Sequence, residues 1–223
     1  MIAVAIDGPA GAGKSAIARR AAKTLGYIYV DTGALYRALG LFVLSKGADP
    51  GDAGAVCGLL GEASIRLAFR NGEQRVFLCE EDVTDRIRTA EVSMAASKVS
   101  AYPEVRKFLL SLQRELARNS NVIMDGRDIG TVVLPEAQVK LFLTASPEER
   151  ARRRYEEMLG KGVKADYASV LEDMKKRDYS DTHRAEAPLR PAAEAMVVDT
   201  TGNTLEQSVG EIVGIIRERL DQI

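Results

Sequence analysis

Short apolar runs alternate with longer segments of helical periodicity along most of the chain. Five runs have the length and composition of buried strands, at residues 2–6, 27–30, 121–124, 139–144 and 196–198. The segments between and after them carry apolar residues at helical spacing, as residues 14–25 and 205–220 illustrate. This alternation predicts a three-layer α/β fold, in which helices cover both faces of a five-stranded parallel core sheet.

The pattern changes between residues 61 and 101. Residues 64–69 and 74–78 alternate between apolar and polar positions, and Asn71-Gly72 between them is a strong signal for a hairpin turn. Helical spacing returns from Thr89 to Ser100 and again after Pro103. We therefore expect one unit with its core at about 1–60 and 102–223, and an inserted region at about 61–101 that contains a small antiparallel hairpin.

The first predicted strand leads into a glycine-rich loop, Gly8 to Ser15, which fits the pattern G-x-x-x-x-G-K-[S/T] at every fixed position. In this context backbone N–H groups converge on a phosphate, Lys14 reaches the β- and γ-phosphates, and the Ser15 hydroxyl ligates Mg²⁺. The fold is then of the P-loop NTPase type. The alternative is a turn that binds nothing. We expect ATP to be bound by Gly8, Pro9, Ala10, Gly11, Ala12, Gly13, Lys14, Ser15 and Ala16.

Charged residues also follow the second and third core strands. Tyr36 and Arg37 lie just after the second strand, and Asp125-Gly126-Arg127-Asp128 follows the third. Ligands of open α/β sheets bind at the carboxyl ends of strands, so these residues are expected on the same rim as the glycine loop. The alternative for the second group is a polar turn without chemistry.

A further concentration of charge begins at Ser146-Pro147-Glu148-Glu149, which predicts a helix start with a capping box. This helix carries Arg150, Arg152, Arg153 and Arg154, and Gly160-Lys161-Gly162 separates it from a helix that starts near residue 166. The arginines are either a solvated face or part of a short mobile lid, at about 153–165, that closes over a polyphosphate.

The second of these helices is predicted to carry Arg177, Asp181 and Arg184 at positions i, i+4 and i+7. That spacing puts all three on one face. They are either an exposed ladder of ion pairs, which would stabilise the helix by only about 0.3–0.5 kcal/mol per pair, or part of a binding site.

Charge and cysteine content limit the partners. The net charge of −1 argues against broad affinity for nucleic acid or acidic membranes. Cys57 and Cys79 are too few for a disulfide framework, and no window has the length and hydropathy of a membrane span or signal peptide. We expect a monomeric cytoplasmic protein that acts on small molecules.

The phosphate loop alone does not decide between a kinase, a GTPase switch, a motor ATPase and a nucleotide-dependent binding protein. The chain has no N-K-x-D stretch to recognise guanine, and it is short for a motor ATPase. Its arginines instead occur in several separate segments, which suits an enzyme that grips a second phosphorylated substrate. These are Arg37, Arg106, Arg127, and Arg177 with Arg184.

At this level of detail the chain resembles the bacterial cytidylate kinases, which are nucleoside monophosphate kinases. The resemblance rests on IDGPAGAGKS, DTGALYR, the hairpin insertion, DGRDIGT and KKRDYSDTHRAEAPL, in this order. It implies transfer of the γ-phosphoryl group of ATP to CMP or dCMP with Mg²⁺, and a place in pyrimidine metabolism. Two alternatives stay open: a kinase for another monophosphate or a shikimate-like alcohol, and a nucleotide-binding regulator without turnover.

The resemblance also implies residue roles. Ser97, Arg106 and Asp128 correspond to residues that recognise cytosine, whose N4 donor and N3 and O2 acceptors suit this donor and acceptor set. Tyr36 corresponds to the residue that stacks on the base. Substrate-binding positions further include Thr32, Arg37, Arg127, Arg177, Asp181 and Arg184, and the catalytic set is Lys14, Arg127, Arg184 and, from the lid, Arg154. Ala16 replaces a hydroxyl residue that many relatives carry, which removes one expected contact to ATP.

Overall fold

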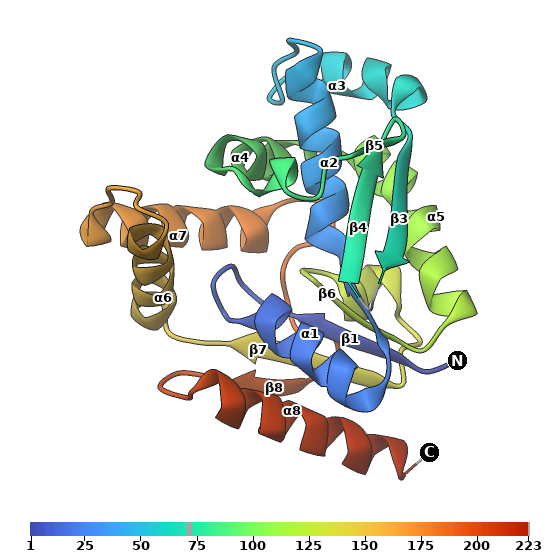
Figure 1. Ribbon diagram of the computed structural model, residues 1–223, viewed down its shortest axis with the longest axis vertical. Coiled ribbons are helices and arrows are strands. Elements are labelled where there is room, and N and C mark those ends of the chain that lie inside the picture. The colour runs from blue at the N-terminus through green and yellow to red at the C-terminus, as the bar shows by residue number, and fades with distance from the viewer. Residues whose placement is uncertain (71–72, 223) are drawn as a thin grey trace.

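A parallel sheet forms the centre of the computed structural model, which describes residues 1–70 and 73–222 (Figure 1). Its five strands lie in the order β2-β6-β1-β7-β8. They are β1 (Ala3–Asp7), β2 (Ile28–Asp31), β6 (Val122–Gly126), β7 (Val139–Thr144) and β8 (Met196–Asp199). The predicted five-stranded parallel sheet, with helices on both faces, is therefore confirmed.

The two faces of the sheet are covered by different elements. On one face α1 (Lys14–Leu25) and α8 (Leu205–Leu220) lie side by side and pack on Val4 and Ile6 of β1. On the other face Ala5 contacts a group of residues that includes Ile129 and Val133 of a π-helical turn, Ile129–Val133. The chain thus leaves neighbouring strands β1 and β6 toward opposite faces. Such a divergence at the carboxyl ends of parallel strands is where α/β sheets bind ligands.

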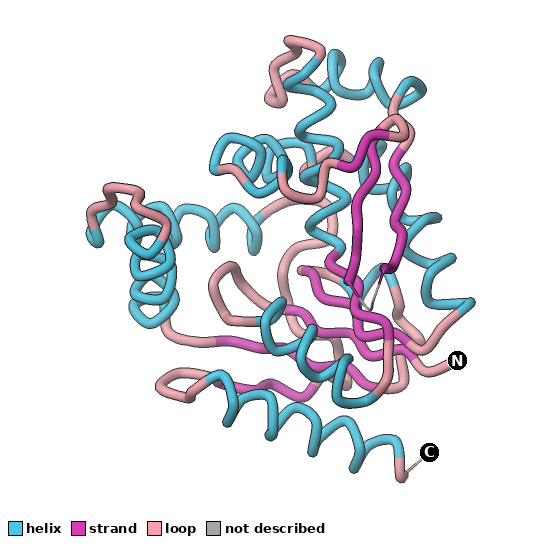
Figure 2. Tube along the Cα trace, viewed as in Figure 1, coloured by secondary structure: helices cyan, strands magenta, loops and turns pink. Residues whose placement is uncertain are grey.

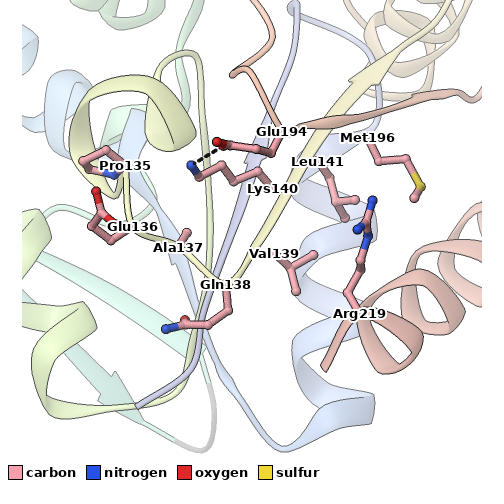
Figure 3. A pocket seen from close by; sticks show the side chains of 10 residues that line it. All are labelled: Pro135, Glu136, Ala137, Gln138, Val139, Lys140, Leu141, Glu194, Met196 and Arg219. Atoms are coloured by element: carbon pink, nitrogen blue, oxygen red, sulfur yellow. Dashed lines mark hydrogen bonds and ion pairs between the residues drawn. The ribbon is translucent and has the colours of Figure 1, made fainter. Parts of the chain in front are cut away.

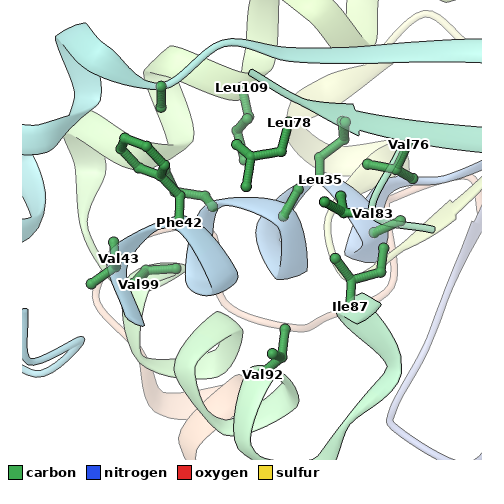
Figure 4. Close-up of a cluster of buried hydrophobic side chains, with 14 of the residues drawn as sticks. Leu35, Phe42, Val43, Val76, Leu78, Val83, Ile87, Val92, Val99 and Leu109 are labelled. Atoms are coloured by element: carbon green, nitrogen blue, oxygen red, sulfur yellow. The ribbon is translucent and has the colours of Figure 1, made fainter. Parts of the chain in front are cut away.

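A second apolar core lies beyond the sheet and is organised around α2 (Thr32–Ser45) (Figure 4). Leu35, Leu39 and Phe42 of this helix are buried. A Cβ atom at Gly40 would lie 2.9 Å from the backbone nitrogen of Ala96, so glycine lets α4 (Ala90–Val99) approach α2 closely. The other elements between α2 and β6 are α3 (Ala53–Leu59), β3 (Ile65–Arg70), β4 (Glu73–Leu78), β5 (Glu81–Asp82) and α5 (Pro103–Asn119).

The predicted hairpin is present as β3 and β4, which pair in antiparallel register from Ile65 opposite Leu78 to Arg70 opposite Glu73. The predicted Asn71-Gly72 turn lies outside the described residues. A third strand, β5, was not predicted, because two residues are too few to set up an alternating pattern. Two short 3₁₀ segments, Leu60–Glu62 and Arg86–Arg88, complete this region.

The helices α6 (Pro147–Gly160) and α7 (Tyr167–His183) pack on each other and stand out from the sheet (Figure 2). The expected capping box at α6 is wrong in one half. The Ser146 hydroxyl accepts from the Glu149 amide at 3.2 Å, but the Glu149 carboxylate binds Arg152 and Arg153 instead of returning to the Ser146 amide.

The prediction that Arg184 lies on the same helix as Arg177 is also wrong. The helix α7 ends at His183, and Arg184 follows it with extended backbone angles, φ −63° and ψ 143°. Its amide still donates to the Ser180 carbonyl at 3.1 Å. Within the residues described, no helix is both long and apolar enough to cross a bilayer.

Candidate active site

The glycine loop connects β1 to α1, and its conformation requires glycine. Gly8 has φ 146°, and a Cβ atom there would lie 1.9 Å from the Leu143 carbonyl oxygen. Gly13 occupies the N-cap of α1 with φ 82° and has no side chain to accept from the first-turn amides. These amides, at the positive end of the helix dipole, are therefore left for an anion.

Lys14 lies inside this loop. Its Nζ atom donates to the Pro9 carbonyl at 2.7 Å, and the side chain is buried. Burial lowers the pKa of Lys14, and the nearby Arg127 lowers it further. An anion in the loop would relieve both effects, since a charged ammonium group is stabilised by opposite charge.

The Ser15 hydroxyl donates to Oδ2 of Asp125 at 2.8 Å, across the boundary between β1 and β6. The Tyr29 hydroxyl donates to the other carboxylate oxygen of Asp125 at 2.9 Å. Asp125 is buried, which raises its pKa to about 6, and the charge of Asp31 adds to this. The sequence placed Asp125 in a charged turn without giving it a role. Its position after an apolar strand beside a phosphate loop was the available signal.

The Ser15 hydroxyl and the Asp125 carboxylate suit a magnesium ion better than a metal whose ligands all come from the protein. Among residues 1–70 and 73–222 there is no group of three or more His, Cys, Asp or Glu residues that could hold a metal. Mg²⁺ keeps several waters and is typically bound by one or two protein oxygens together with substrate phosphates. A hydroxyl and a carboxylate next to the phosphate loop satisfy that requirement.

Opposite the loop, four segments contribute to a cluster of arginines and aspartates. Arg37 pairs with Asp31 at 2.6 Å and Arg127 pairs with Asp181 at 2.9 Å. Two further arginines of the predicted set lie at the Asp128 carboxylate. Arg106 forms an ion pair with one of its oxygens, and Nη2 of Arg184 lies 3.9 Å from the other. The guanidinium of Arg106 also lies 5.7 Å from the centre of the Tyr36 ring. The structure therefore brings together Tyr36, Arg37, Arg106, Arg127, Asp128, Asp181 and Arg184.

This cluster, which we call the acceptor cluster, contains buried donors without partners. Arg37 Nε and Arg184 Nη2 are buried, and neither has a hydrogen-bond acceptor in the part of the chain that the structure describes. Burial lowers the pKa of Arg184, as does the charge of Arg106. Buried polar atoms are nearly always hydrogen-bonded, so unpaired guanidinium nitrogens indicate a site for an anionic ligand. Arg177 lies nearby on α7, one turn before Asp181, with its side chain exposed.

Besides Arg177, three predicted residues form no side-chain hydrogen bond or ion pair with this cluster in the described chain: Thr32, Ser97 and Arg154. The Thr32 hydroxyl donates to the Asp125 carbonyl at 2.8 Å. Arg106 bonds the Ser100 carbonyl at 3.1 Å rather than the Ser97 side chain. Arg154 pairs with Glu157 of its own helix at 2.9 Å, and 42% of its side chain is exposed. Of the two alternatives for the charged face of α7, the exposed ladder of ion pairs does not fit, because Asp181 is buried and pairs with Arg127.

Arg150 was not predicted as a site residue, yet it connects the loop to both projecting helices. Its guanidinium donates to the Ala10 carbonyl at 3.1 Å and binds both carboxylate oxygens of Asp178 at 3.1 and 2.6 Å. Only 3% of the residue is exposed. The solvated-face interpretation therefore fails for Arg150, whereas it fits Arg152, which pairs with Glu149 and Glu156 on the surface of α6.

A surface pocket of about 330 Å³ lies apart from this site, at the amino-terminal end of β7 (Figure 3). Lys140 and Glu194 form an ion pair at 2.9 Å across it. The phosphate loop follows the opposite end of the neighbouring strand β1, so this pocket takes no part in the candidate site.

A family model described as cytidylate kinase matches residues 4–218. The chain belongs to the cytidylate kinase family. It is 50% identical over 218 residues to the cytidylate kinase of Carboxydothermus hydrogenoformans, with 98% of each chain covered. It is 48% identical over 217 residues to the cytidylate kinase of Leuconostoc mesenteroides, with 97% of each covered. The prediction of a nucleoside monophosphate kinase that acts on CMP or dCMP is thereby confirmed, and the alternatives are not favoured.

Solved structures support the fold. An uncharacterized protein from Eubacterium ventriosum aligns with a TM-score of 0.54 at 12% identity, covering 97% of this chain and 99% of its own. The shikimate kinase from Bacteroides thetaiotaomicron aligns with a TM-score of 0.50 at 12% identity, covering 97% and 98%. At these identities the likeness concerns the architecture and not the substrate.

Proposed function

We propose that this member of the cytidylate kinase family transfers the γ-phosphoryl group of ATP to CMP or dCMP between the glycine loop and the acceptor cluster. One observation carries the proposal: the two sites lie at the carboxyl ends of adjacent strands β1 and β6, and the acceptor cluster holds buried guanidinium nitrogens that have no hydrogen-bond acceptor among the described residues. Such nitrogens are expected where a phosphate binds.

On the ATP side, the loop from Gly8 to Ala16 would bind the phosphates through backbone N–H groups. Lys14 would exchange its bond to the Pro9 carbonyl for a phosphate oxygen. Ser15 and Asp125 would hold Mg²⁺, which, when bound, neutralises charge on the phosphates. Ala16 offers no hydroxyl to the nucleotide.

On the CMP side, Asp128 would accept from the cytosine amine, with Arg106 and Ser97 as donors to the ring acceptors. Uracil presents the reversed pattern, which would leave these buried groups unpaired. Tyr36 would stack on the base, and Arg177 and Asp181 would contact the sugar. The phosphate would be held by Arg37, Arg127 and Arg184, while Thr32 would line the pocket.

The reaction needs no strong base, because the attacking phosphate oxygen is already ionised at neutral pH. Alignment and charge stabilisation would then supply most of the rate. Lys14, Arg127 and Arg184 would face the transferring group. Closure of the lid at about 153–165 would bring Arg154 from its pair with Glu157 onto the phosphates and exclude water.

A direct test measures ADP formation from ATP with CMP, with shikimate and without an acceptor. Rapid ADP formation only with CMP is the expected result. No turnover with CMP would contradict the proposal and favour a regulator, and turnover with shikimate would favour another kinase.

We further propose a cytoplasmic monomer in pyrimidine metabolism without nucleic-acid or membrane partners. A dimer in light scattering would contradict the monomer.

A further inference from the structure

Asp7 is a buried carboxylate to which the reaction described above assigns no role. It is the last residue of β1, directly before the glycine loop, and only 3% of it is exposed. No lysine or arginine of residues 1–70 and 73–222 forms an ion pair with it, although Lys14 and Asp128 are close enough to influence its charge. Burying a carboxylate without an opposite charge destabilises a fold unless hydrogen bonds compensate, so the contacts of Asp7 indicate its role.

The carboxylate is bonded to the turn that follows Asp128. Oδ1 of Asp7 accepts from the Ile129 amide at 2.7 Å, and Oδ2 accepts from the Gly130 amide at 2.8 Å. The Asp7 carboxylate thereby accepts hydrogen bonds from the first two N–H groups of this turn.

The turn depends on such outside partners because it is short and irregular. It consists of five residues in π-helical conformation, preceded by Asp128 with φ −149° and ψ 27°. Its own bonds run from the amides of Val132 and Val133 to the Asp128 carbonyl and from the Leu134 amide to the Ile129 carbonyl. A single turn must order several residues for each hydrogen bond that it forms, so it is weak alone.

A second charged side chain binds the far end of the same turn. Arg114 of α5 donates through Nε to the Val133 carbonyl at 3.0 Å and through Nη2 to the Val132 carbonyl at 2.9 Å. The same helix supplies Arg106 to Asp128. The turn is thus held by an anion at its amides and by a cation at its carbonyls, as a helix dipole favours.

We propose that Asp7 and Arg114 are positioning residues, which fix the Asp128 carboxylate in place for the acceptor base by holding the two ends of the Ile129–Val133 turn. This inference rests on the proposed role of Asp128 in recognising cytosine. It also gives the two substrate sites a common support, since Asp7 belongs to the strand that carries the ATP loop.

The test compares Asp7→Asn and Arg114→Gln with Val213→Ala, a control in the apolar layer between α8 and the sheet. Loss of one or two hydrogen bonds to the turn should raise the KM for CMP about tenfold and reduce the CMP-to-UMP ratio of kcat/KM by a similar factor. The KM for ATP should stay within about twofold of wild type in Arg114→Gln, because Arg114 does not touch the loop. Arg114→Lys, which keeps the charge but loses the pair of guanidinium donors, should fall between wild type and Arg114→Gln.

A purely structural role predicts a different result. Both variants would then lower the melting temperature as Val213→Ala does and leave the CMP-to-UMP ratio unchanged, which would overturn the proposal. A wild-type protein without activity on CMP would instead contradict the proposed function. In that case hydrogen exchange of the Ile129 and Gly130 amides still tests the role of Asp7. Exchange as slow in Asp7→Asn as in wild type would show that Asp7 does not hold the turn.

Discussion

The two halves of the active site are built in different ways. The glycine loop of the ATP side is one continuous stretch of chain, and its polar side chains have partners within the protein: Lys14 binds the Pro9 carbonyl and Ser15 binds Asp125. The acceptor cluster comes from separate segments joined by ion pairs, and Arg37 and Arg184 retain buried nitrogens without partners among the described residues. The donors left for a ligand are backbone N–H groups at the start of α1 on the ATP side, and guanidinium nitrogens of side chains in the acceptor cluster.

This difference explains how a common phosphate loop serves a specific enzyme. Backbone N–H groups and one lysine bind any triphosphate, because phosphates are alike in every nucleotide. Recognition of one base requires donors and acceptors that would be left unpaired by another base. The specificity should therefore reside in the acceptor cluster, and variants of the two halves should affect different kinetic constants.

The largest effect is expected from Lys14→Met, which removes the charged side chain from the ATP side. Single electrostatic contacts to a transition state are typically worth about 100- to 1000-fold in kcat, and we expect a loss in this range. CMP binding measured by calorimetry without ATP should change little. Lys23→Met, at the exposed end of the same helix, is the matched control. Retention of more than about a tenth of wild-type kcat in a coupled assay would contradict this role.

The next largest effect is expected from Asp128→Asn in the acceptor cluster. The change removes the negative partner of Arg106 and replaces an acceptor for the cytosine amine with an amide. We expect about a 100-fold fall in kcat/KM for CMP, a smaller fall for UMP, and an unchanged affinity for ATP. Asp49→Asn on the surface serves as the control. A weakened affinity for ATP, with CMP unaffected, would show that the division into two halves is wrong.

A smaller effect concerns Asp7, which lies between the halves. Burial raises its pKa from 3.8 to about 6, so the folded protein binds this proton more tightly than the unfolded chain does. The resulting stabilisation is complete below about pH 4 and is lost as the pH rises through about 6. From about pH 5 to about pH 7 the unfolding free energy of wild type should fall by about 1 kcal/mol relative to Asp7→Asn. Urea denaturation at both pH values measures this difference, and an unchanged difference would refute the assignment.

The smallest expected effect comes from the hairpin. The Gln74 side chain accepts from the Asp31 amide at 2.9 Å and donates to the Asp31 carbonyl at 3.3 Å, while the Asp31 carboxylate holds Arg37. Gln74→Leu should loosen Arg37 and raise the KM for CMP about threefold, leaving the KM for ATP unchanged. The neighbouring exposed Glu73→Gln should leave both constants as in wild type. An equal rise in the KM for CMP and the KM for ATP would show that Gln74 does not act through the acceptor cluster.

The same contrast decides what the sequence could predict. The position of the loop from Gly8 to Ser15 between a strand and a helix was predicted from consecutive residues, and its contacts to ATP stay a prediction. The five strands followed from apolar runs. The roles of Asp125 and Arg150 were not predicted, since they depend on contacts with Ser15 and Ala10, which lie 110 and 140 residues away. The members of the acceptor cluster were predicted from the resemblance to a family. Their ion pairs, and the guanidinium nitrogens without a hydrogen-bond acceptor among the described residues, could be seen only in the structure.

Two local predictions failed because other contacts of the same side chain or a change of backbone direction competed with them. Glu149 was expected to complete a capping box, but two arginines on its own helix bind its carboxylate more favourably than an amide would. Arg184 was expected to continue α7, but its extended backbone leaves the helix at the acceptor cluster, where its Nε donates to the Ala187 carbonyl at 2.8 Å. Helical spacing cannot anticipate where a helix ends when no glycine or proline marks the position.

The central claim is that the acceptor cluster selects the base while the loop supplies only phosphate binding. The most direct measurement is kcat/KM in a coupled assay with CMP, dCMP, UMP, AMP and GMP at fixed ATP and Mg²⁺. The account predicts the highest values for CMP and dCMP, with UMP lower and the purine monophosphates lower by at least about 100-fold. Equal values for CMP and AMP would contradict base selection by Ser97, Arg106 and Asp128.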